Sequence, residues 1–158
     1  MSRKKIGAAV IAVVVLGLAF IFYSQMTPDE YAPTDDEIAL HIQFDTSEDI
    51  GLLVYDYRAD GYGSSGGTSN ADGSLMKRDS SIIVGLNKAE LNASADVVDF
   101  SVRFRVITEY VAPNYENRYP DDITKYLEPI SWEARFGESY FITIAGDKTN
   151  GYRAVWSE

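Results

Sequence analysis

Hydrophobic and polar residues alternate strictly in several segments of this chain. In residues 98–106, valine or phenylalanine occupies every second position, and aspartate, serine or arginine stands between them. A period of two residues is typical of a β-strand with one buried face and one exposed face. Alternating or short apolar runs of this kind predict seven strands, at residues 38–45, 50–57, 80–87, 97–110, 130–136, 139–145 and 152–156.

The breaks between these segments indicate how the strands connect. Asn150-Gly151 precedes the last strand and is a strong hairpin signal. Short helical turns are expected at residues 88–91 and 121–127, with no longer helix after residue 38. Seven short strands without a long helix predict an all-β fold. We expect an antiparallel β-sandwich of immunoglobulin-like or similar type, with a closed barrel as the alternative.

The first 37 residues do not follow this alternation. Residues 6–23 are an uncharged, apolar run that would rise about 27 Å as a helix, close to the hydrocarbon thickness of a bilayer. Arg3, Lys4 and Lys5 precede the run and acidic residues follow it. We therefore expect a single transmembrane helix with its N-terminus in the cytoplasm. A cleaved signal peptide is the competing interpretation.

The chain thus divides into four predicted regions. They are a basic cytoplasmic N-terminus (1–5), a membrane anchor (6–23), an acidic linker with two prolines (24–37) and an extracytoplasmic β-sandwich domain (38–158). The predicted location is the cell membrane, with a single pass and the β-domain outside.

Charge and cysteine content exclude several functions. The net charge is −10, and without the three basic residues that precede the anchor, 11 basic side chains face 24 acidic ones, which gives −13. The electrostatic field of this excess negative charge repels nucleic acid, so no nucleic-acid partner is expected. The sequence has no cysteine, which excludes disulfides, thiolate catalysis and cysteine-based zinc sites.

Residues 56–79 are rich in glycine, serine and acidic or amide side chains. From Thr68 onward, the order of these side chains overlaps the twelve-residue calcium loop, although Thr68 and Asp79 replace its usual first and last ligands. The candidate metal ligands are Asn70, Asp72, Asp79, Asp56 and Asp60. The alternative is a solvated connection, because Asn-x-Asp-Gly is also common turn chemistry. Calcium is the one cofactor considered.

Two further groups of residues are candidates for binding a ligand or a partner. Aromatic rings beside charged groups are typical of a glycan or peptide groove, and the candidates are Tyr55, Tyr57, Tyr62 and Arg58. Arg103 and Arg105 form a basic stripe on the polar side of one predicted strand. These two arginines either bind an acidic partner or form cross-strand ion pairs, and the excess of acidic residues favours ion pairs.

The sequence contains little that indicates catalysis. His41 is the only histidine, and no serine lies in a G-x-S-x-G motif. We therefore expect a binding or assembly module that is not an enzyme, an accessory component of a cell-envelope complex with a protein partner. The alternatives are a glycan- or calcium-binding surface module that uses residues 56–79, and an envelope hydrolase.

Overall fold

The structure, a computed structural model, describes residues 31–114 and 116–157. The expected anchor at residues 6–23 lies outside these residues. Within the described part of the chain, no helix is long and apolar enough to cross a membrane. Asp36, in the expected linker, already contacts the domain, because its carboxylate pairs with Lys88 Nζ at 3.0 Å.

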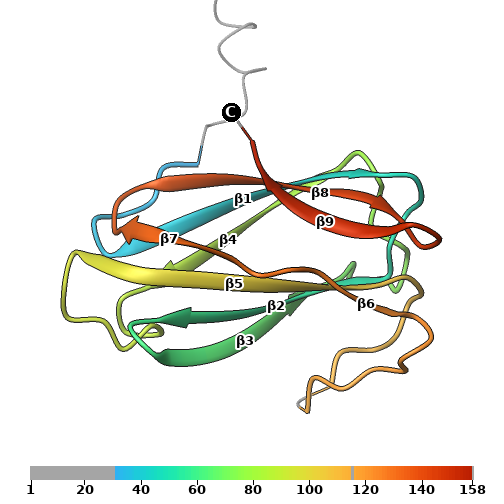
Figure 1. Cartoon of the computed structure of the whole chain (residues 1–158), viewed down its shortest axis with the longest axis horizontal. Coiled ribbons are helices and arrows are strands. Elements are labelled where there is room, and N and C mark those ends of the chain that lie inside the picture. The colour runs from blue at the N-terminus through green and yellow to red at the C-terminus, as the bar shows by residue number, and fades with distance from the viewer. Residues whose placement is uncertain (1–30, 115, 158) are drawn as a thin grey trace, which may run out of the picture. The chain divides into compact units, whose positions relative to one another are not determined.

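Nine β-strands make up the described domain (Figure 1). They are β1 (Glu37–Thr46), β2 (Leu52–Ala59), β3 (Tyr62–Thr68), β4 (Ser81–Asn87), β5 (Val97–Ile107), β6 (Thr124–Tyr126), β7 (Ile130–Arg135), β8 (Ser139–Asp147) and β9 (Gly151–Trp156).

The strands form two sheets that pack together. One sheet has the order β4-β1-β8-β9, and the other has β3-β2-β5, with β6 and β7 both pairing with the same strand, β5. The all-β prediction with two sheets is confirmed. The expectation of purely antiparallel pairing is wrong for β1 and β8, which run parallel. This direction is available to β8 because it enters its sheet from β7, a strand of the other sheet.

All seven predicted segments contain a strand, whereas β3 and β6 were not predicted. The helical turn expected at residues 121–127 is wrong over residues 124–126, which pair with β5 as β6, whereas a single turn is present at residues 88–91, where Leu91 N donates to Asn87 O at 3.1 Å. Segments this short supply too few helical hydrogen bonds to offset the cost of starting a helix.

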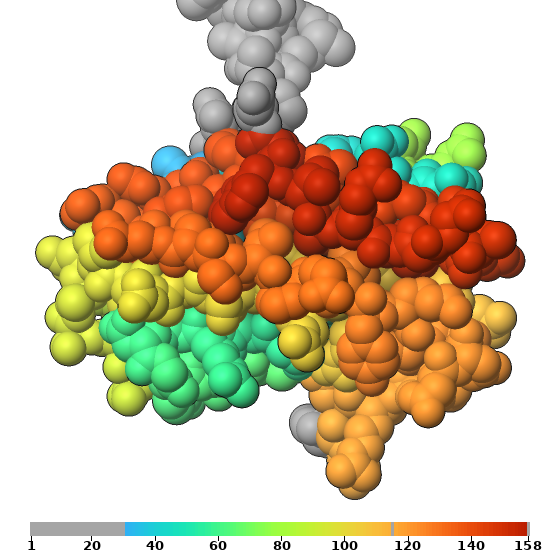
Figure 2. Space-filling view, viewed as in Figure 1, coloured from blue at the N-terminus to red at the C-terminus, as the bar shows by residue number. Residues whose placement is uncertain are grey.

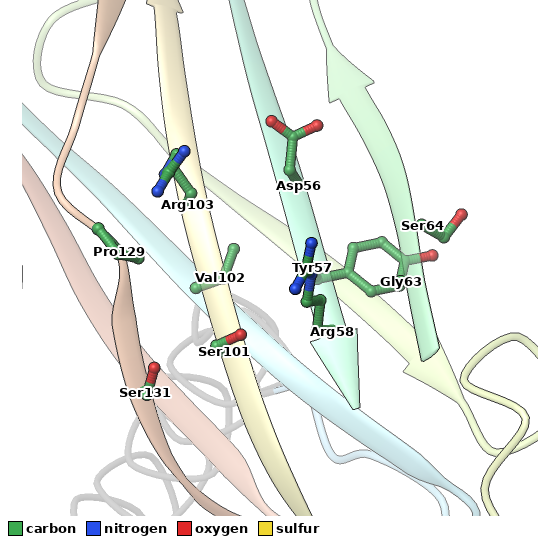
Figure 3. A pocket seen from close by; sticks show the side chains of 10 residues that line it. All are labelled: Asp56, Tyr57, Arg58, Gly63, Ser64, Ser101, Val102, Arg103, Pro129 and Ser131. Carbon is green, nitrogen blue, oxygen red and sulfur yellow. The ribbon is translucent and has the colours of Figure 1, made fainter. Parts of the chain in front are cut away.

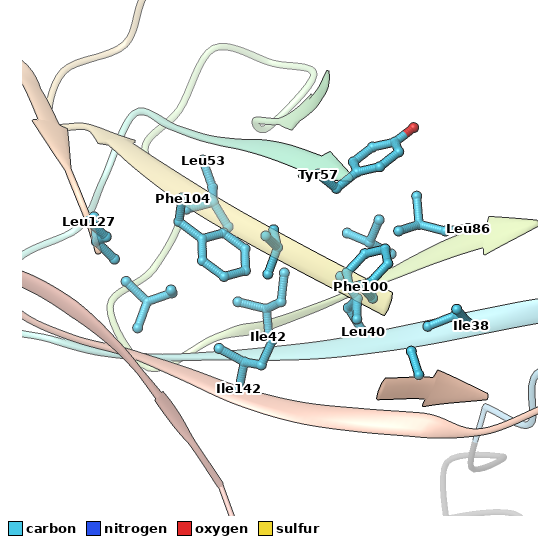
Figure 4. Close-up of a cluster of buried hydrophobic side chains, with 14 of the residues drawn as sticks. Ile38, Leu40, Ile42, Leu53, Tyr57, Leu86, Phe100, Phe104, Leu127 and Ile142 are labelled. Carbon is cyan, nitrogen blue, oxygen red and sulfur yellow. The ribbon is translucent and has the colours of Figure 1, made fainter. Parts of the chain in front are cut away.

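The alternating apolar residues meet between the two sheets (Figure 4). Phe100 and Phe104 of β5 lie opposite Ile42 of β1 and Ile142 of β8, and all four side chains are at most 1% exposed. Burial of each such side chain contributes about 1.5–3 kcal/mol. At one margin of the sandwich, Trp132 of β7 packs edge-on against Trp156 of β9, with ring centroids 4.7 Å apart. Both tryptophans therefore report on the packing of the two sheets.

Candidate functional site

A hairpin builds one side of the candidate site. Asp60 and Gly61, with φ of 48° and 86°, form the two-residue turn between β2 and β3. Positive φ at both positions is the signature of a type I′ turn, and Asp-Gly is a preferred pair for it. This dipeptide was the sequence signal for β3, which lies inside the segment expected to be a connection.

Glycines in β3 make room for side chains of β2. A Cβ at Gly63 would lie 3.3 Å from Arg58 Cγ and 3.7 Å from Arg58 Nε, so the arginine side chain lies across Gly63 on the outer face of the sheet. On the inner face, the ring of Tyr55 covers Gly66 in the same way, and a Cβ there would meet it at 2.4 Å. β3 therefore has few large side chains of its own, and side chains of β2 cover both of its faces.

A groove of about 600 Å³ lies on the outer face of the five-stranded sheet (Figure 3). Its lining comes from β2, β3, β5 and β7 with the residue before β7, and consists of Asp56, Tyr57, Arg58, Gly63, Ser64, Ser101, Val102, Arg103, Pro129 and Ser131. Most of the side chains are polar, and two are arginines. Sequence reasoning identified Arg58 and Arg103 but missed Ser101 and Ser131, because an isolated serine on a strand carries no signal of its own.

The two groove arginines are exposed and lie on neighbouring strands. Arg58 faces Ser101 in the pairing of β2 with β5, and Arg103 stands two positions further along β5. Diagonal neighbours of this kind are about 7–8 Å apart at their backbones, so both guanidinium groups can reach a single anion. Neither arginine takes part in an ion pair within residues 31–114 and 116–157.

Arg105 has a different environment, although it lies on the same face of β5. It is only 8% exposed, and its Nη2 pairs with Asp56 Oδ1 at 2.9 Å. Its Nη1 donates to the carbonyl oxygen of Asn117 at 2.8 Å, and its guanidinium lies 6.0 Å from the ring centroid of Tyr126. For Arg105, the prediction of a cross-strand ion pair is confirmed.

A polar network fixes the connection between β5 and β6 to the sheet. Ser65 Oγ donates to Asp56 Oδ1 at 2.7 Å, and the Asn117 amide donates in turn to Ser65 Oγ. Together with the bonds of Arg105, these contacts close a ring of four residues. Figures 1 and 2 show this connection projecting from one end of the domain.

A second, smaller hydrophobic cluster lies beneath the same connection. Leu52 and Val54 of β2 and Ile107 of β5 are fully buried on the outer face of the sheet. The residues that cover them are Val111, Tyr119 and Ile123. The outer face thus has a covered end with its own apolar cluster and an open end with the groove, and Asp56 and Arg105 stand at the boundary.

The structure separates the predicted tyrosine group. Tyr57 is buried in the main core, and Tyr55 packs against that core, where burial raises the pKa of its hydroxyl. Both rings lie on the inner side of the sheet, whereas Arg58 lies on the outer side. Tyr62 is 47% exposed, at the start of β3. Tyr57 lines the groove but is only 7% exposed, and neither Tyr55 nor Tyr62 belongs to the lining, so the groove offers no exposed tyrosine ring from this set to a sugar.

The five candidate metal ligands also do not form a single cluster. Asp56 belongs to the Arg105 network, and Asp60 Oδ1 accepts the backbone N–H of Asp99 at 2.9 Å. Asp72 accepts hydrogen bonds from the hydroxyl and N–H of Ser74, which hold the pKa of its carboxyl below the ordinary value.

Of the remaining two candidates, Asn70 is linked to Asp72 through Ser74, because its amide donates to Ser74 Oγ at 3.0 Å and that hydroxyl donates to Asp72. The Asn70 amide donates to Leu75 O, and Asp79 uses its backbone oxygen to accept from Gln43. In the described part of the chain, no three His, Asp or Glu side chains gather closely enough to hold a metal ion. Calcium binding stays a prediction.

The outer face of the other sheet holds a smaller hollow of about 350 Å³. His41 lies there, stacked on Phe141 with ring centroids 4.6 Å apart and with its Nε2 3.1 Å from Ser139 Oγ. Phe141 is 44% exposed. The surroundings of the histidine are mainly apolar, whereas the groove of the five-stranded sheet contains charged side chains.

No known protein-family model matches this chain, and no curated protein matches it. Among solved structures, the membrane-binding domain of pneumolysin is similar, with 11% identity, 77% of this chain and 96% of that chain covered, and a TM-score of 0.38. A non-hemolytic pneumolysin from Streptococcus pneumoniae strain ST306 gives 10% identity, 77% and 23% coverage and 0.38. The human-specific toxin intermedilysin gives 14% identity, 77% and 24% coverage and 0.33. Likenesses at these TM-scores establish neither a family nor a function.

Proposed function

We propose that this chain is a membrane-anchored, extracytoplasmic binding module whose β-domain holds an acidic protein partner of the cell envelope in the groove of the five-stranded sheet. The observation that carries the proposal is the pair of exposed arginines, Arg58 and Arg103, which have no ion-pair partner among the described residues. In a chain of net charge −10, two neighbouring cations that form no ion pair within the described residues favour binding of an anionic group.

The anchoring part of the proposal is supported by the sequence. The apolar run at residues 6–23 has basic residues before it and acidic residues after it, a pattern that favours a domain outside the membrane. The linker that follows would let the domain search for its partner near the bilayer surface. A stable partner must bury more than about 1,000 Å² in total, which exceeds the groove itself and requires contacts on its rim.

Photo-crosslinking in the cells that produce the protein tests this proposal. A photoreactive residue replaces Ser131, which lines the groove, and in a matched control it replaces Thr149, in the β8–β9 turn. We expect one protein adduct from position 131, none from position 149, and loss of the adduct in the variant R58Q/R103Q. Identical adducts from both positions, or an adduct that does not depend on the arginines, would contradict the proposal.

A further inference from the structure

We propose that the partner binds as an extended peptide that adds a strand to the open edge of β3 and places one carboxylate against Arg58. This inference rests on the proposed function, because it specifies the class of partner for that site. β3 is the end strand of the five-stranded sheet, and within the described residues it pairs only with β2 (Figure 1). An unpaired edge offers backbone donors and acceptors to an incoming strand.

The hairpin geometry identifies which backbone groups face the open edge. In a two-residue hairpin, the flanking residues Ala59 and Tyr62 exchange both of their hydrogen bonds, and the direction then alternates along each strand. An independent contact agrees with this pattern, because Asp60 N donates to Asp99 O of β5 at 3.1 Å. The backbone N–H and C=O of Asp60 therefore face β5, and those of its neighbour Ala59 face β3. Gly63, Ser65 and Gly67 therefore point their N–H and C=O groups away from β2, and all three are exposed.

The edge lacks the usual protection against pairing. Proteins block exposed edges with charged residues or proline, and β3, with the sequence YGSSGGT, has neither. At other edges, β7 carries Glu133 and Arg135, and β9 carries Arg153. β4 also lacks charge, but β3 differs from it because the Arg58 side chain lies across Gly63 toward the edge.

The charges around the groove favour a peptide with one isolated carboxylate over a polyanion. Beyond Arg58 along the strands, Asp60 lies next to Asp99, and Asp99 pairs in register with Glu133 of β7. A second anionic group in that direction would meet three carboxylates. Side chains on one face of an extended peptide repeat about every 6.6–6.8 Å, which matches the rows of the sheet. A single acidic residue can therefore face Arg58 while its neighbours avoid the acidic row.

The test uses the intact chain in detergent micelles and a defined probe, a nine-residue capped peptide of threonine with one central glutamate. We expect amide hydrogen exchange at Gly63, Ser65 and Gly67 to slow at least about tenfold at saturating peptide, since each amide is then covered or hydrogen-bonded. A peptide with glutamine at the centre should bind roughly tenfold more weakly, because it loses a charge-assisted pair. The variant R58Q should abolish this difference between the two peptides.

Two matched controls separate strand addition from simple charge attraction. A peptide with the same glutamate but N-methyl groups on alternate residues keeps its charge and cannot pair with an edge. In the protein, G67P removes one edge-facing N–H, whereas G67A keeps it, and a Cβ at that position has no neighbour closer than 3.5 Å. We expect G67P to lower peptide affinity roughly fivefold, and by more than G67A does, because only proline removes the N–H. If G67P does not fold, the N-methylated peptide provides the same test on the native chain.

The outcomes distinguish this inference from the proposed function. Arginine-dependent crosslinking in cells, together with equal binding of the N-methylated peptide or unchanged exchange at the three amides, would overturn strand addition and leave the binding module intact. Loss of the arginine-dependent crosslink would overturn both. Slow, concentration-dependent exchange at the three amides without peptide would show that the edge pairs with a second copy of this chain, which also overturns the inference.

Discussion

Arg103 and Arg105 lie two positions apart on the same face of β5, and their surroundings are opposite. Arg105 is buried, paired with Asp56 and bonded to Asn117, whereas Arg103 is exposed and has no ion pair among the described residues. The strand is the same, so the cause is the connection between β5 and β6, which folds over one end of the sheet. The covered end therefore serves stability, and the open end is available for binding.

The largest expected effect comes from the apolar cluster at the covered end. We expect I107A to lower the free energy of unfolding by about 3 kcal/mol, because it removes fully buried methyl groups and leaves a cavity. Urea denaturation followed by tryptophan fluorescence measures this change, since Trp132 of one sheet packs against Trp156 of the other at the margin of the sandwich. The control I83A changes a side chain that is 45% exposed and should cost much less. Equal losses for the two variants would show that the connection does not cover this end of the sheet.

Exchange of the two arginines for methionine tests the comparison directly. We expect R105M to destabilise the domain by about 2 kcal/mol, below the range for fully buried ion pairs because the Asp56 side chain is 40% exposed. R103M should change stability by less than about 0.5 kcal/mol. The same urea measurement applies to both. Similar losses for both variants would contradict the distinction between a buried, structural arginine and an exposed one.

The alternation of the sequence predicted seven strands and the inner face of β5, but it could not separate these two arginines. A period of two residues says which face a side chain is on, and only the path of residues 108–123 decides whether that face is covered. β3 gave no alternation because it has no apolar side chain except Tyr62, and its faces are covered by Arg58 and Tyr55. Its only signal was Asp60-Gly61.

The groove was predictable only in part, for a related reason. Arg58 was identified beside the tyrosines at residues 55–62, and Arg103 as one of the two arginines of a basic stripe. Their neighbours Ser101 and Ser131 come together through the pairing of β5 with β7, which a single sequence does not reveal. β6 has three residues, too few to show any period.

The same contrast between covered and open polar groups occurs at Glu48 and Asp49. Glu48 accepts a hydrogen bond from the hydroxyl of Tyr152, which is 8% exposed, whereas Asp49 binds the exposed Lys77. Burial, and then the contact with Glu48, raise the pKa of Tyr152 above its ordinary value of 10.0. Because the folded-state pKa is the higher one, this contribution to stability is complete below pH 10 and is lost as the pH rises through the folded-state pKa.

Among the three variants expected to be destabilised, I107A, R105M and Y152F, the smallest effect is that of Y152F, and it changes with pH. At pH 7 the variant should lose about 1 kcal/mol of unfolding free energy, the usual net value of one hydrogen bond. Above pH 10 its stability should fall less steeply than that of the native chain. Some decline remains, because the pKa values of Tyr55 and Tyr140 are also raised by burial. Urea unfolding between pH 7 and 11 measures both quantities, with Y62F as the exposed control. If the unfolding free energy of Y152F and that of the native chain fell in parallel with pH, the Tyr152 hydroxyl would be open to water. The contrast between covered and open polar groups would then apply only to the sheet face that carries Arg105.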